Sequence, residues 1–409
     1  MRITRKTVAG TAAAVGTTLV LAACSSTASP EASGSPDADG DAAALESVKM
    51  CVLVADVTSS EALSFRDYYT QYVASEFPVE FVYSDELADA EAEKTAMEGF
   101  IANNCEAVIS FASADRPTQL DMAEDAGIYY AVATGALSEE EYETFKDYEY
   151  YVGAIGPDVM TEYQAGYDMA QYFIGEGDTS FGIFGGGIPY YLEMHIYRAA
   201  GMLAALAEDP TTSYGGATEM GDILGKIYAD GTINIGDFES DVYELTGYLE
   251  TWDFDAAWQA SMADMVGASP DAILAVGTGN AILGSAVDGT GIQIGDIDAY
   301  TEDNLAAMEN GTLGYLAGKF TSINGPIFAA TYSAVVGEPY RTEDGSAFAL
   351  SQGYWTATSA EEFQEIIDAD NVETPVYDAD TLTPFIAQGA TFDEFADFVS
   401  KYTFADLAG

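Results

Sequence analysis

The stretch Val48-Lys-Met-Cys-Val-Leu-Val-Ala-Asp56 is a short apolar run that ends in a carboxylate, and an amphipathic segment over 61–76 follows it. Short runs of Val, Ile, Leu and Phe favour buried strands, whereas apolar residues three and four positions apart favour helices. The same alternation continues along most of the chain. Repeated strand and helix units predict a parallel sheet covered by helices.

Ten apolar runs are expected to form strands, and the stretch 209–231 is expected to be rich in loops. Ten strands are many for a single open sheet, so two lobes are expected. The predicted fold class is therefore α/β, with two doubly wound parallel-sheet lobes. The expected strands cover 49–55, 79–83, 105–111, 128–133, 150–155, 180–185, 232–236, 271–276, 291–297 and 313–317.

The composition is strongly acidic: 13 Lys and Arg face 68 Asp and Glu, which gives a formal net charge of −55. A nucleic-acid partner is excluded, because it requires a basic surface. With one histidine, His195, and three cysteines, neither a His/Cys metal site nor a Ser-His-Asp triad is expected. The composition therefore favours a binding protein over an enzyme, without a cofactor or metal.

The first 23 residues have the pattern of a secretory signal peptide. Three cations precede an apolar run over 8–21, and the Leu-Ala-Ala sequence before Cys24 is typical of a lipobox. We expect cleavage after residues 1–23 to leave Cys24 as a lipid-modified N-terminus. Residues 24–47 are rich in Ser, Ala, Pro, Gly and Asp and predict a flexible linker. The expected location is extracytoplasmic, with a lipid anchor in the cell membrane.

Two further cysteines occupy equivalent places in two apolar runs. Cys51 and Cys105 each stand five residues before the polar end of a run, at Asp56 and Ser110. If the two runs are adjacent parallel strands, the sulfur atoms lie at about one level. A disulfide between them is then expected outside the cytoplasm, with two buried free thiols as the alternative.

Ligands of open parallel sheets bind beyond the carboxyl ends of the strands, where this chain places polar residues. Asp56 could accept hydrogen bonds from ligand hydroxyls, or it could cap a helix. Phe65 could stack on a flat ring, or it could belong to the core. Beyond the third expected strand, Ser113, Asp115 and Arg116 are further candidates, and a guanidinium in so acidic a chain is expected to pair with a carboxylate.

The second half of the chain offers a matching set of candidate residues. Gly186, in a run of three glycines, would let the backbone approach a ligand closely, and Tyr190 could close over it or pack on the lobe surface. Thr278 and Asn280 supply a hydroxyl and an amide at a strand end. Asp298 is the strongest candidate carboxylate of this half, with Asp296 as its competitor. A pair of carboxylates could also serve glycoside hydrolysis, but we favour a clamp on a ligand.

The order of these motifs resembles the type I periplasmic binding proteins over about 48–337. Within that superfamily it is similar to the basic membrane protein lipoproteins, whose best understood members are purine nucleoside receptors of ABC importers. Arg66 stands where the family pattern has Asn, and Gly277-Thr278 where the sugar-binding branch has Asn-Asp. The resemblance is carried by Asp56 with Ser64-Phe65, by Phe184-Gly-Gly-Gly-Ile-Pro189 with Arg198 and Gly201, by Asp271 with the turn Gly277-Thr278-Gly279, and by Gly295-Asp-Ile-Asp298 with Lys319 near the place of a family lysine.

The resemblance implies two lobes joined by three hinge crossovers. We expect the N-terminal lobe to hold 48–157 and about 318–345, and the C-terminal lobe and tail to hold 158–317 and about 346–409. It also implies a monomeric substrate-binding protein that passes a small neutral ligand, first of all a nucleoside, to an ABC permease. A monosaccharide is the alternative ligand, and a ligand-loaded sensor for a membrane receptor is an alternative function.

Overall fold

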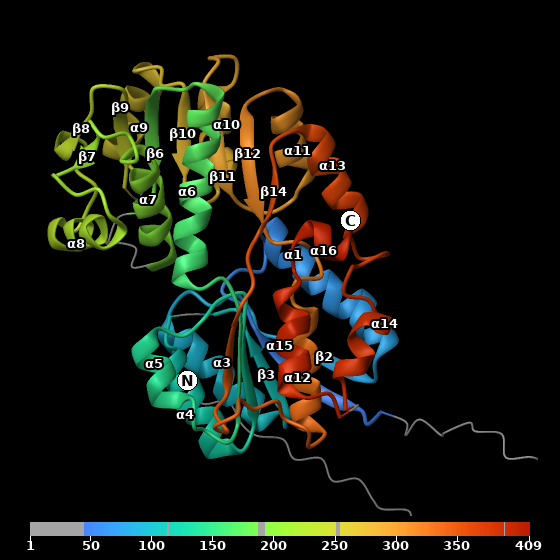
Figure 1. Cartoon of the computed structure of the whole chain (residues 1–409). Coiled ribbons are helices and arrows are strands. Elements are labelled where there is room, and N and C mark those ends of the chain that lie inside the picture. Colours follow the sequence, from blue (N-terminus) through green and yellow to red (C-terminus); the bar gives the residue numbers. More distant parts are fainter. Residues whose placement is uncertain (1–44, 113, 187–192, 251–253, 388) are drawn as a thin grey trace, which may run out of the picture. The chain divides into compact units, whose positions relative to one another are not determined.

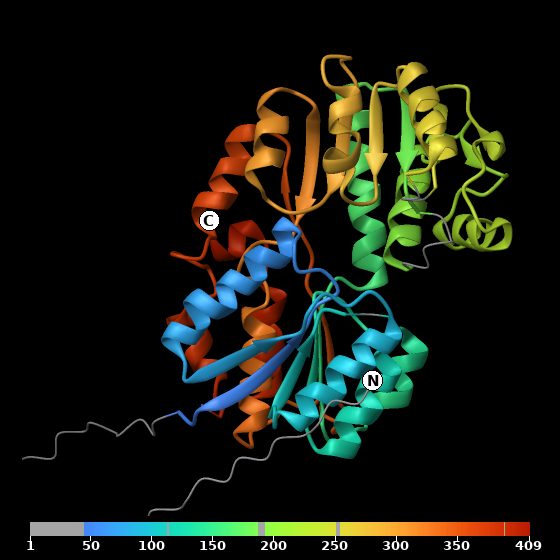
Figure 2. The ribbon, with the colours of Figure 1, turned by 180° about the vertical axis from the view of Figure 1, so that it is seen from behind.

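The computed structural model describes residues 45–112, 114–186, 193–250, 254–387 and 389–409. These residues form two six-stranded sheets with flanking helices and one small two-stranded sheet (Figures 1 and 2). We call the part built on the sheet that contains β1 the first lobe, and the part built on the sheet that contains β6 the second lobe. The expected α/β fold with two parallel-sheet lobes is thus confirmed.

All six strands of the first lobe run parallel, in the order β13-β5-β4-β3-β1-β2. Strands β3 and β5 are buried along their whole length, as parallel strands covered by helices are expected to be. The strands are β1 (Val48–Leu53), β2 (Val79–Tyr83), β3 (Ala107–Ser110), β4 (Tyr129–Ala133), β5 (Tyr151–Gly156) and β13 (Phe348–Ser351), and the helices are α1 (Ser60–Asp67), the π-helix η1 (Tyr68–Val73), α2 (Ala74–Glu76), α3 (Ala90–Ala102), α4 (Arg116–Ala126), α5 (Glu139–Phe145) and α12 (Gly325–Val335).

The second lobe has the order β14-β12-β11-β10-β6-β9, and its edge strand β14 runs antiparallel to β12. Its strands are β6 (Ser180–Phe184), β9 (Glu244–Leu249), β10 (Ala272–Ala275), β11 (Gln293–Ile297), β12 (Leu313–Gly318) and β14 (Trp355–Ala357). Its helices are α6 (Val159–Glu176), α7 (Glu193–Leu206), α8 (Met220–Asp230), α9 (Ala256–Gly267), α10 (Gly279–Val287), α11 (Glu302–Glu309) and α13 (Ala360–Ala369). The lobe also contains the short strands β7 (Ser213–Tyr214) and β8 (Phe238–Glu239) and the 3₁₀-helix η3 (Ile235–Asp237).

Between β1 and β14 the chain passes three times from one lobe to the other. The first crossing (157–158) joins β5 to α6, the second (319–324) joins β12 to α12, and the third (352–354) joins β13 to β14. The third crossing differs from the boundary expected at about 346. Residues 348–351 pair with β5 in the first lobe before the chain returns to the second.

The C-terminal segment after α13 continues beyond these crossings. Helix α13 packs beside β14 and α11 of the second lobe, whereas the next helices pack against α12 and β13 of the first lobe. This segment contains α14 (Ala379–Leu382), the 3₁₀-helix η4 (Thr383–Phe385), α15 (Phe392–Ser400) and α16 (Phe404–Leu407).

The prediction of a strand over 232–236 is wrong. The Asn234 side chain accepts a hydrogen bond from the Gly236 amide and starts the 3₁₀-helix η3 instead. The other edge strand of the second lobe is β9, where buried residues alternate with more exposed ones from Glu244 to Leu249. The polar residues of β9 hide it in a search for continuous apolar runs. The stretch 209–231, expected to be rich in loops, contains helix α8.

Cys51 and Cys105 form a disulfide, with their Cα atoms 5.9 Å apart. β1 and β3 are adjacent and parallel, and Cys51 lies opposite Val108 in the register. Cys105 lies two residues before β3, near enough to Cys51 for the bond to form. In the part of the chain that the structure describes, no helix is both long and apolar enough to cross a membrane.

Helices α6 and α7 touch backbone to backbone through two glycines. A Cβ atom added to Gly166 would lie 2.0 Å from the carbonyl oxygen of Arg198, and one added to Gly201 would lie 2.1 Å from the carbonyl oxygen of Tyr163. No real Cβ atom can occupy such positions. This contact brings Glu162 of α6 and Arg198 of α7 together.

We expect Gly166→Ala to lower the free energy of unfolding by about 1–3 kcal/mol, because the added methyl group must push the two helices apart. Chemical denaturation followed by circular dichroism measures this. Gly175→Ala is the matched control on the same helix, since a Cβ there meets no atom within 4 Å. Better helix propensity should make that variant up to about 1 kcal/mol more stable. Equal effects of the two substitutions would contradict the close helix contact.

Candidate functional site

A cavity of about 960 Å³ lies at the carboxyl ends of the strands of both large sheets. Residues that follow β1, β3, β4 and β5 line it from the first lobe, and residues that follow β10, β11 and β12 line it from the second. This is the edge at which the sequence predicts ligand binding. Six of the expected ligand-binding residues line the cavity: Asp56, Phe65, Arg116, Thr278, Asp298 and Lys319.

Asp56 lies just beyond β1 and organises the turn into α1. Its Oδ1 atom accepts hydrogen bonds from the Thr58 amide (2.7 Å), the Thr58 hydroxyl (2.9 Å) and the Ser59 amide (3.2 Å). Partial burial raises the pKa of Asp56, but these hydrogen bonds outweigh it and hold the pKa below its usual value. Ser59, not Asp56, caps the helix. Asp56 is thus a fixed, ionised acceptor at the cavity wall.

Phe65 supplies an apolar face and is also part of the core. Its ring stacks on the ring of Phe111, with centroids 5.7 Å apart, and both rings line the cavity. Only 5% of Phe65 is exposed. Phe65 is therefore a core residue, as one of the two alternatives predicts, and its ring also forms part of the cavity wall.

Arg116 begins α4 and reaches the cavity beyond β3 and β4. Its Nε donates to the Ala112 carbonyl (3.2 Å) and its Nη1 to the Ala136 carbonyl (2.7 Å). These partners are carbonyl oxygens and not the carboxylate expected for it.

Asp115 does not line the cavity, because its side chain caps α4 by accepting from the Thr118 amide.

Two carboxylates lie at the end of β11, one behind the other. Asp296 is buried and accepts hydrogen bonds from the Asn280 amide (2.8 Å) and the Ile297 amide (2.9 Å). Burial and the neighbouring Asp298 carboxylate raise the pKa of Asp296 to about 7. Asp298 faces the cavity, and burial raises its pKa also. The pair therefore combines a wall carboxylate with a support group behind it.

Asn280 lies in this supporting layer and not on the cavity wall. Its side chain donates to Asn304 Oδ1 (2.8 Å), and Asn304 in turn donates to the Ala299 carbonyl (2.8 Å). These bonds fix the loop that carries Asp298. Thr278 lines the cavity from a left-handed backbone conformation, with φ 53°, at the start of α10.

Lys319 follows β12 at the start of the second crossing. Its Nζ lies 3.2 Å from Glu61 Oε1 on α1, so the ion pair joins the second crossing to the first lobe. A second contact links the same two segments, since the Ser64 hydroxyl donates to the Thr321 hydroxyl (3.1 Å). Glu61 also lines the cavity and has no counterpart among the residues expected from sequence.

A buried network on Arg198 forms the end of the cavity near the crossings. Arg198 Nε donates to Glu162 (2.6 Å) and Nη2 to the Tyr354 hydroxyl (2.7 Å), while Nη1 donates to the Val276 carbonyl. The Tyr354 hydroxyl lies 2.8 Å from Glu162 as well. Sequence reasoning noted Arg198 only as part of a motif and missed both partners. The only signal in the sequence is Arg198 itself, because an arginine is rare in so acidic a chain and this one lies on an apolar helix.

His195 lies one turn before Arg198 and also lines the cavity. Burial and the charges of Arg198 and Lys319 hold its pKa well below the usual range, so its imidazole is neutral at physiological pH.

Within the described ranges, no group of three or more His, Cys, Asp and Glu side chains is arranged to hold a metal ion.

Three expected residues remain. Gly186 is buried with φ 94°, and a Cβ there would lie 2.5 Å from the Ala199 side chain, so it serves the packing of α7 and does not line the cavity. Ser113 and Tyr190 lie outside the described residues, as do Cys24, the signal peptide 1–23 and most of the expected linker.

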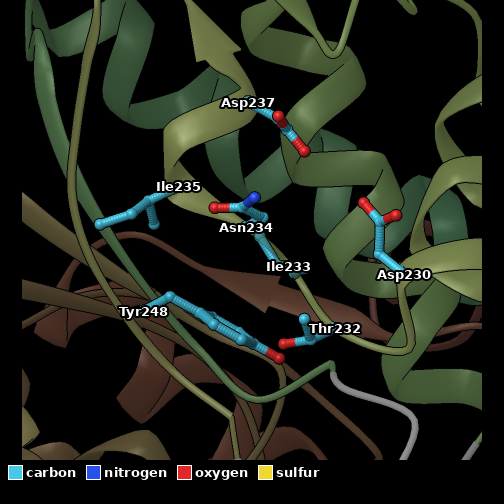
Figure 3. A pocket seen from close by; sticks show the side chains of 7 residues that line it. All are labelled: Asp230, Thr232, Ile233, Asn234, Ile235, Asp237 and Tyr248. Carbon is cyan, nitrogen blue, oxygen red and sulfur yellow. The ribbon is translucent and has the colours of Figure 1, made fainter.

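A second hollow of about 530 Å³ lies within the second lobe (Figure 3). Thr232, Asn234 and the Tyr248 ring line it together with Asp230 and Asp237. Both carboxylates are bound by the same Lys226 ammonium, at 2.7 and 2.8 Å. Because this hollow has no wall from the first lobe, it lacks the two-sided geometry of the larger cavity.

No protein-family model matches the chain, and no curated protein matches it. Solved structures share its fold. An ABC transporter solute-binding protein from Bacillus halodurans C-125 with bound myo-inositol is 16% identical, covers 78% of this chain and 96% of its own, and has a TM-score of 0.53. A periplasmic sugar-binding protein from Pseudomonas fluorescens is 13% identical, with coverages of 88% and 100% and a TM-score of 0.60.

A third structure, an ABC transporter periplasmic solute-binding protein from Actinobacillus succinogenes 130z with bound D-allose, is 13% identical, with coverages of 78% and 99% and a TM-score of 0.57. The chain therefore has the fold of the type I periplasmic binding proteins. At these identities the likeness shows the fold alone.

Asp296 should make the stability of the protein fall as pH rises. Its pKa is about 7 in the folded protein and about 3.9 in the unfolded chain. Between these values the folded protein holds more protons, so the free energy of unfolding decreases with rising pH. Chemical denaturation near pH 5 and near pH 8 measures this decline, and Asp296→Asn should reduce it.

Asp288→Asn is the control, because Asp288 is exposed at the other end of α10. It should keep the decline of the wild type. A decline of wild-type size in Asp296→Asn would show that Asp296 is already ionised at neutral pH in the folded protein.

Proposed function

We propose that this protein is the substrate-binding component of an ABC importer and that its ligand is a small neutral sugar or sugar-like polyol. The observation that carries the proposal is the cavity at the carboxyl ends of both parallel sheets, whose walls combine carboxylates, cationic donors and an aromatic face. Two solved structures with this fold hold myo-inositol and D-allose, which supports a polyhydroxylated ligand.

The cavity matches the chemistry of a sugar ring. Hydroxyl groups both donate and accept, so Asp56 and Asp298 can accept from them while Arg116 and Lys319 donate to them. Each such hydrogen bond to a charged group contributes about 1.5–3 kcal/mol. The apolar C–H face of a sugar can pack on the Phe65 ring.

Charge favours a neutral ligand over an anion. Carboxylates outnumber cations on the cavity wall, and the chain as a whole is strongly negative, so an anion would be repelled during its approach. The cavity carboxylates are Asp56, Glu61, Glu139, Glu141, Asp158, Glu162, Glu193 and Asp298, and the cations are Arg66, Arg116, Arg198 and Lys319.

A nucleoside is the second candidate. The stacked pair of Phe65 and Phe111 could face a nucleobase, as the motif resemblance implies, and ribose hydroxyls could use the same carboxylates. The sequence placed a nucleoside first. We now place the sugar first, because the compared structures name sugars or inositol and because charged and polar side chains line the cavity from both lobes.

Binding would favour the arrangement in which both walls touch the ligand. Asp56, Phe65 and Arg116 belong to the first lobe, whereas Thr278 and Asp298 belong to the second. A ligand held by both sets stabilises that arrangement by its differential affinity. A permease could then distinguish the loaded protein from the empty one.

A thermal-shift screen of residues 24–409 against monosaccharides, inositols and nucleosides tests the ligand class. A true ligand at 100 times its dissociation constant adds about 2.7 kcal/mol to stability, so the melting temperature should rise with a sugar or inositol. A rise with nucleosides alone would replace the sugar by the second candidate. If no compound in the panel raised the melting temperature, both proposals would fail.

Asp298→Asn sharpens this test, because it keeps the shape and the acceptor for the Ala299 amide but removes the charge. We expect the dissociation constant to rise about tenfold or more, as a charge-assisted hydrogen bond becomes a neutral one. Asp264→Asn, on an exposed position of α9, is the matched control and should bind as the wild type does. Isothermal titration calorimetry compares the two, and equal affinities would remove Asp298 from the site.

We propose in addition that Cys24 carries the lipid anchor and that the protein acts as a monomer beside its permease. Detergent phase partitioning of the protein expressed from its full sequence tests the anchor. The wild type should enter the detergent phase and Cys24→Ser the aqueous phase, since the acyl chains supply the membrane affinity. Wild-type protein in the aqueous phase would contradict lipidation.

A further inference from the structure

The segment from Asp370 to Leu407, which we call the C-terminal clasp, takes no part in the cavity wall but contacts both lobes and two of the three crossings. It leaves the second lobe after α13 and packs against the first lobe through α14, η4 and α15 (Figure 1). It is therefore a fourth connection between the lobes.

The clasp is attached to the second crossing through Asp370. This carboxylate is 3% exposed and accepts from the Ser322 amide (2.8 Å), the Ser322 hydroxyl (2.6 Å) and the Val376 amide (2.8 Å). The Tyr377 amide donates to the Ser322 hydroxyl in return (3.2 Å). Burial raises the pKa of Asp370 to about 6 against the effect of these hydrogen bonds, so the group is mostly ionised at neutral pH.

The clasp also holds the third crossing. Gln352 of this crossing donates to the Tyr377 hydroxyl (3.1 Å), and the indole of Trp355, which begins β14 directly after the crossing, donates to the Tyr402 carbonyl (2.6 Å). Trp355 stacks on Phe320 of the second crossing, with ring centroids 4.1 Å apart. The second and third crossings are thus joined to each other and to the clasp.

The first lobe provides the clasp with a firm base. The Tyr68 hydroxyl donates to the Tyr377 carbonyl (2.6 Å), and the Ala379 amide donates to the Tyr72 hydroxyl (2.9 Å). Farther along the clasp, the Phe395 ring stacks on Tyr340 at 4.4 Å. These contacts bury apolar area and keep the clasp on the first lobe.

The second crossing carries Lys319 to the cavity wall, three residues before Ser322. Lys319 pairs with Glu61, and the next but one residue after it, Thr321, meets Ser64. On its other side the crossing is held by its own turn, by Asp370 and Tyr377 at Ser322, and by the Tyr69 hydroxyl, which donates to the Asn324 carbonyl (3.0 Å). The attachment at Ser322 is the nearest of these to Lys319, so the position of Lys319 depends on it as well as on Glu61.

We propose that the C-terminal clasp positions the second crossing for ligand binding, with Asp370 as the positioning residue that acts through Ser322 on Lys319. The inference rests on the proposed sugar-binding function, because Lys319 is assigned to the ligand there. It gives the segment after α13 a role in affinity, besides its role in folding.

A double-mutant cycle between Ser322→Ala and Lys319→Met tests the positioning. Ser322→Ala removes the hydroxyl that joins Asp370 to Tyr377 and leaves the backbone bond to Asp370 in place. It should raise the dissociation constant for the best sugar of the screen about five- to tenfold. In the Lys319→Met background the same substitution should have no further effect.

Ser400→Ala is the matched control, since the Ser400 hydroxyl lies on an exposed turn of the clasp and donates only to the Asp397 carbonyl. Its affinity should equal that of the wild type. Equal penalties of Ser322→Ala with and without Lys319 would overturn the positioning and leave the clasp a purely structural element. Unchanged affinity in Ser322→Ala would overturn it as well.

Hydrogen exchange of the ligand-free protein separates this inference from the sugar proposal. Asp370→Asn cannot accept from both Ser322 groups and Val376, so exchange at residues 318–324 should be about tenfold faster, at a melting temperature still above the assay temperature. Unchanged exchange there would overturn the clasp, whether or not a sugar binds. If no sugar binds the wild type but exchange responds, the proposed ligand fails and the clasp stands.

Discussion

The buried Arg198 guanidinium joins four segments of the chain. Its donors reach Glu162 at the start of α6, the end of β10 and Tyr354 in the third crossing, and Arg198 itself lies on α7. Removing the carboxylate partner of a buried guanidinium costs about 3–5 kcal/mol, and for Arg198 that partner is Glu162. The end of the second lobe that faces the cavity and the third crossing are therefore held relative to this one group.

The glycine contacts between α6 and α7 bring the members of that network within hydrogen-bond distance. Gly166 and Gly201 bring the two helix backbones together, and Glu162 and Arg198 then meet across the interface at 2.6 Å. A larger residue at either glycine would move the carboxylate away from the guanidinium. The glycine contacts and the Glu162–Arg198 ion pair therefore hold the same two helices, and together they fix this part of the cavity wall.

The strand-end rule predicted the position of the site but not its supporting groups. Asp56, Thr278 and Asp298 could be found because each follows an apolar run, and parallel strands end at one edge. Glu162 and Tyr354 could not be found in this way, because neither directly follows an apolar run. They are also 192 residues apart, so the sequence gives no sign that they meet. Asn280 and Asp115 sit at strand ends too, yet they bind neighbouring backbone or side chains. Spacing alone does not separate a wall residue from one that caps a helix.

The clasp and the ligand site depend on the same short crossings. Asp370, Phe320 and Trp355 contact the chain where it passes between the lobes, and a rotation of one lobe against the other displaces atoms least near such points. Contacts there can stiffen the connection without blocking small rotations. The apolar base of the clasp lies on the first lobe, away from the cavity wall. An aromatic C-terminal segment can thus influence the position of Lys319, while the cavity wall itself is formed at the strand ends.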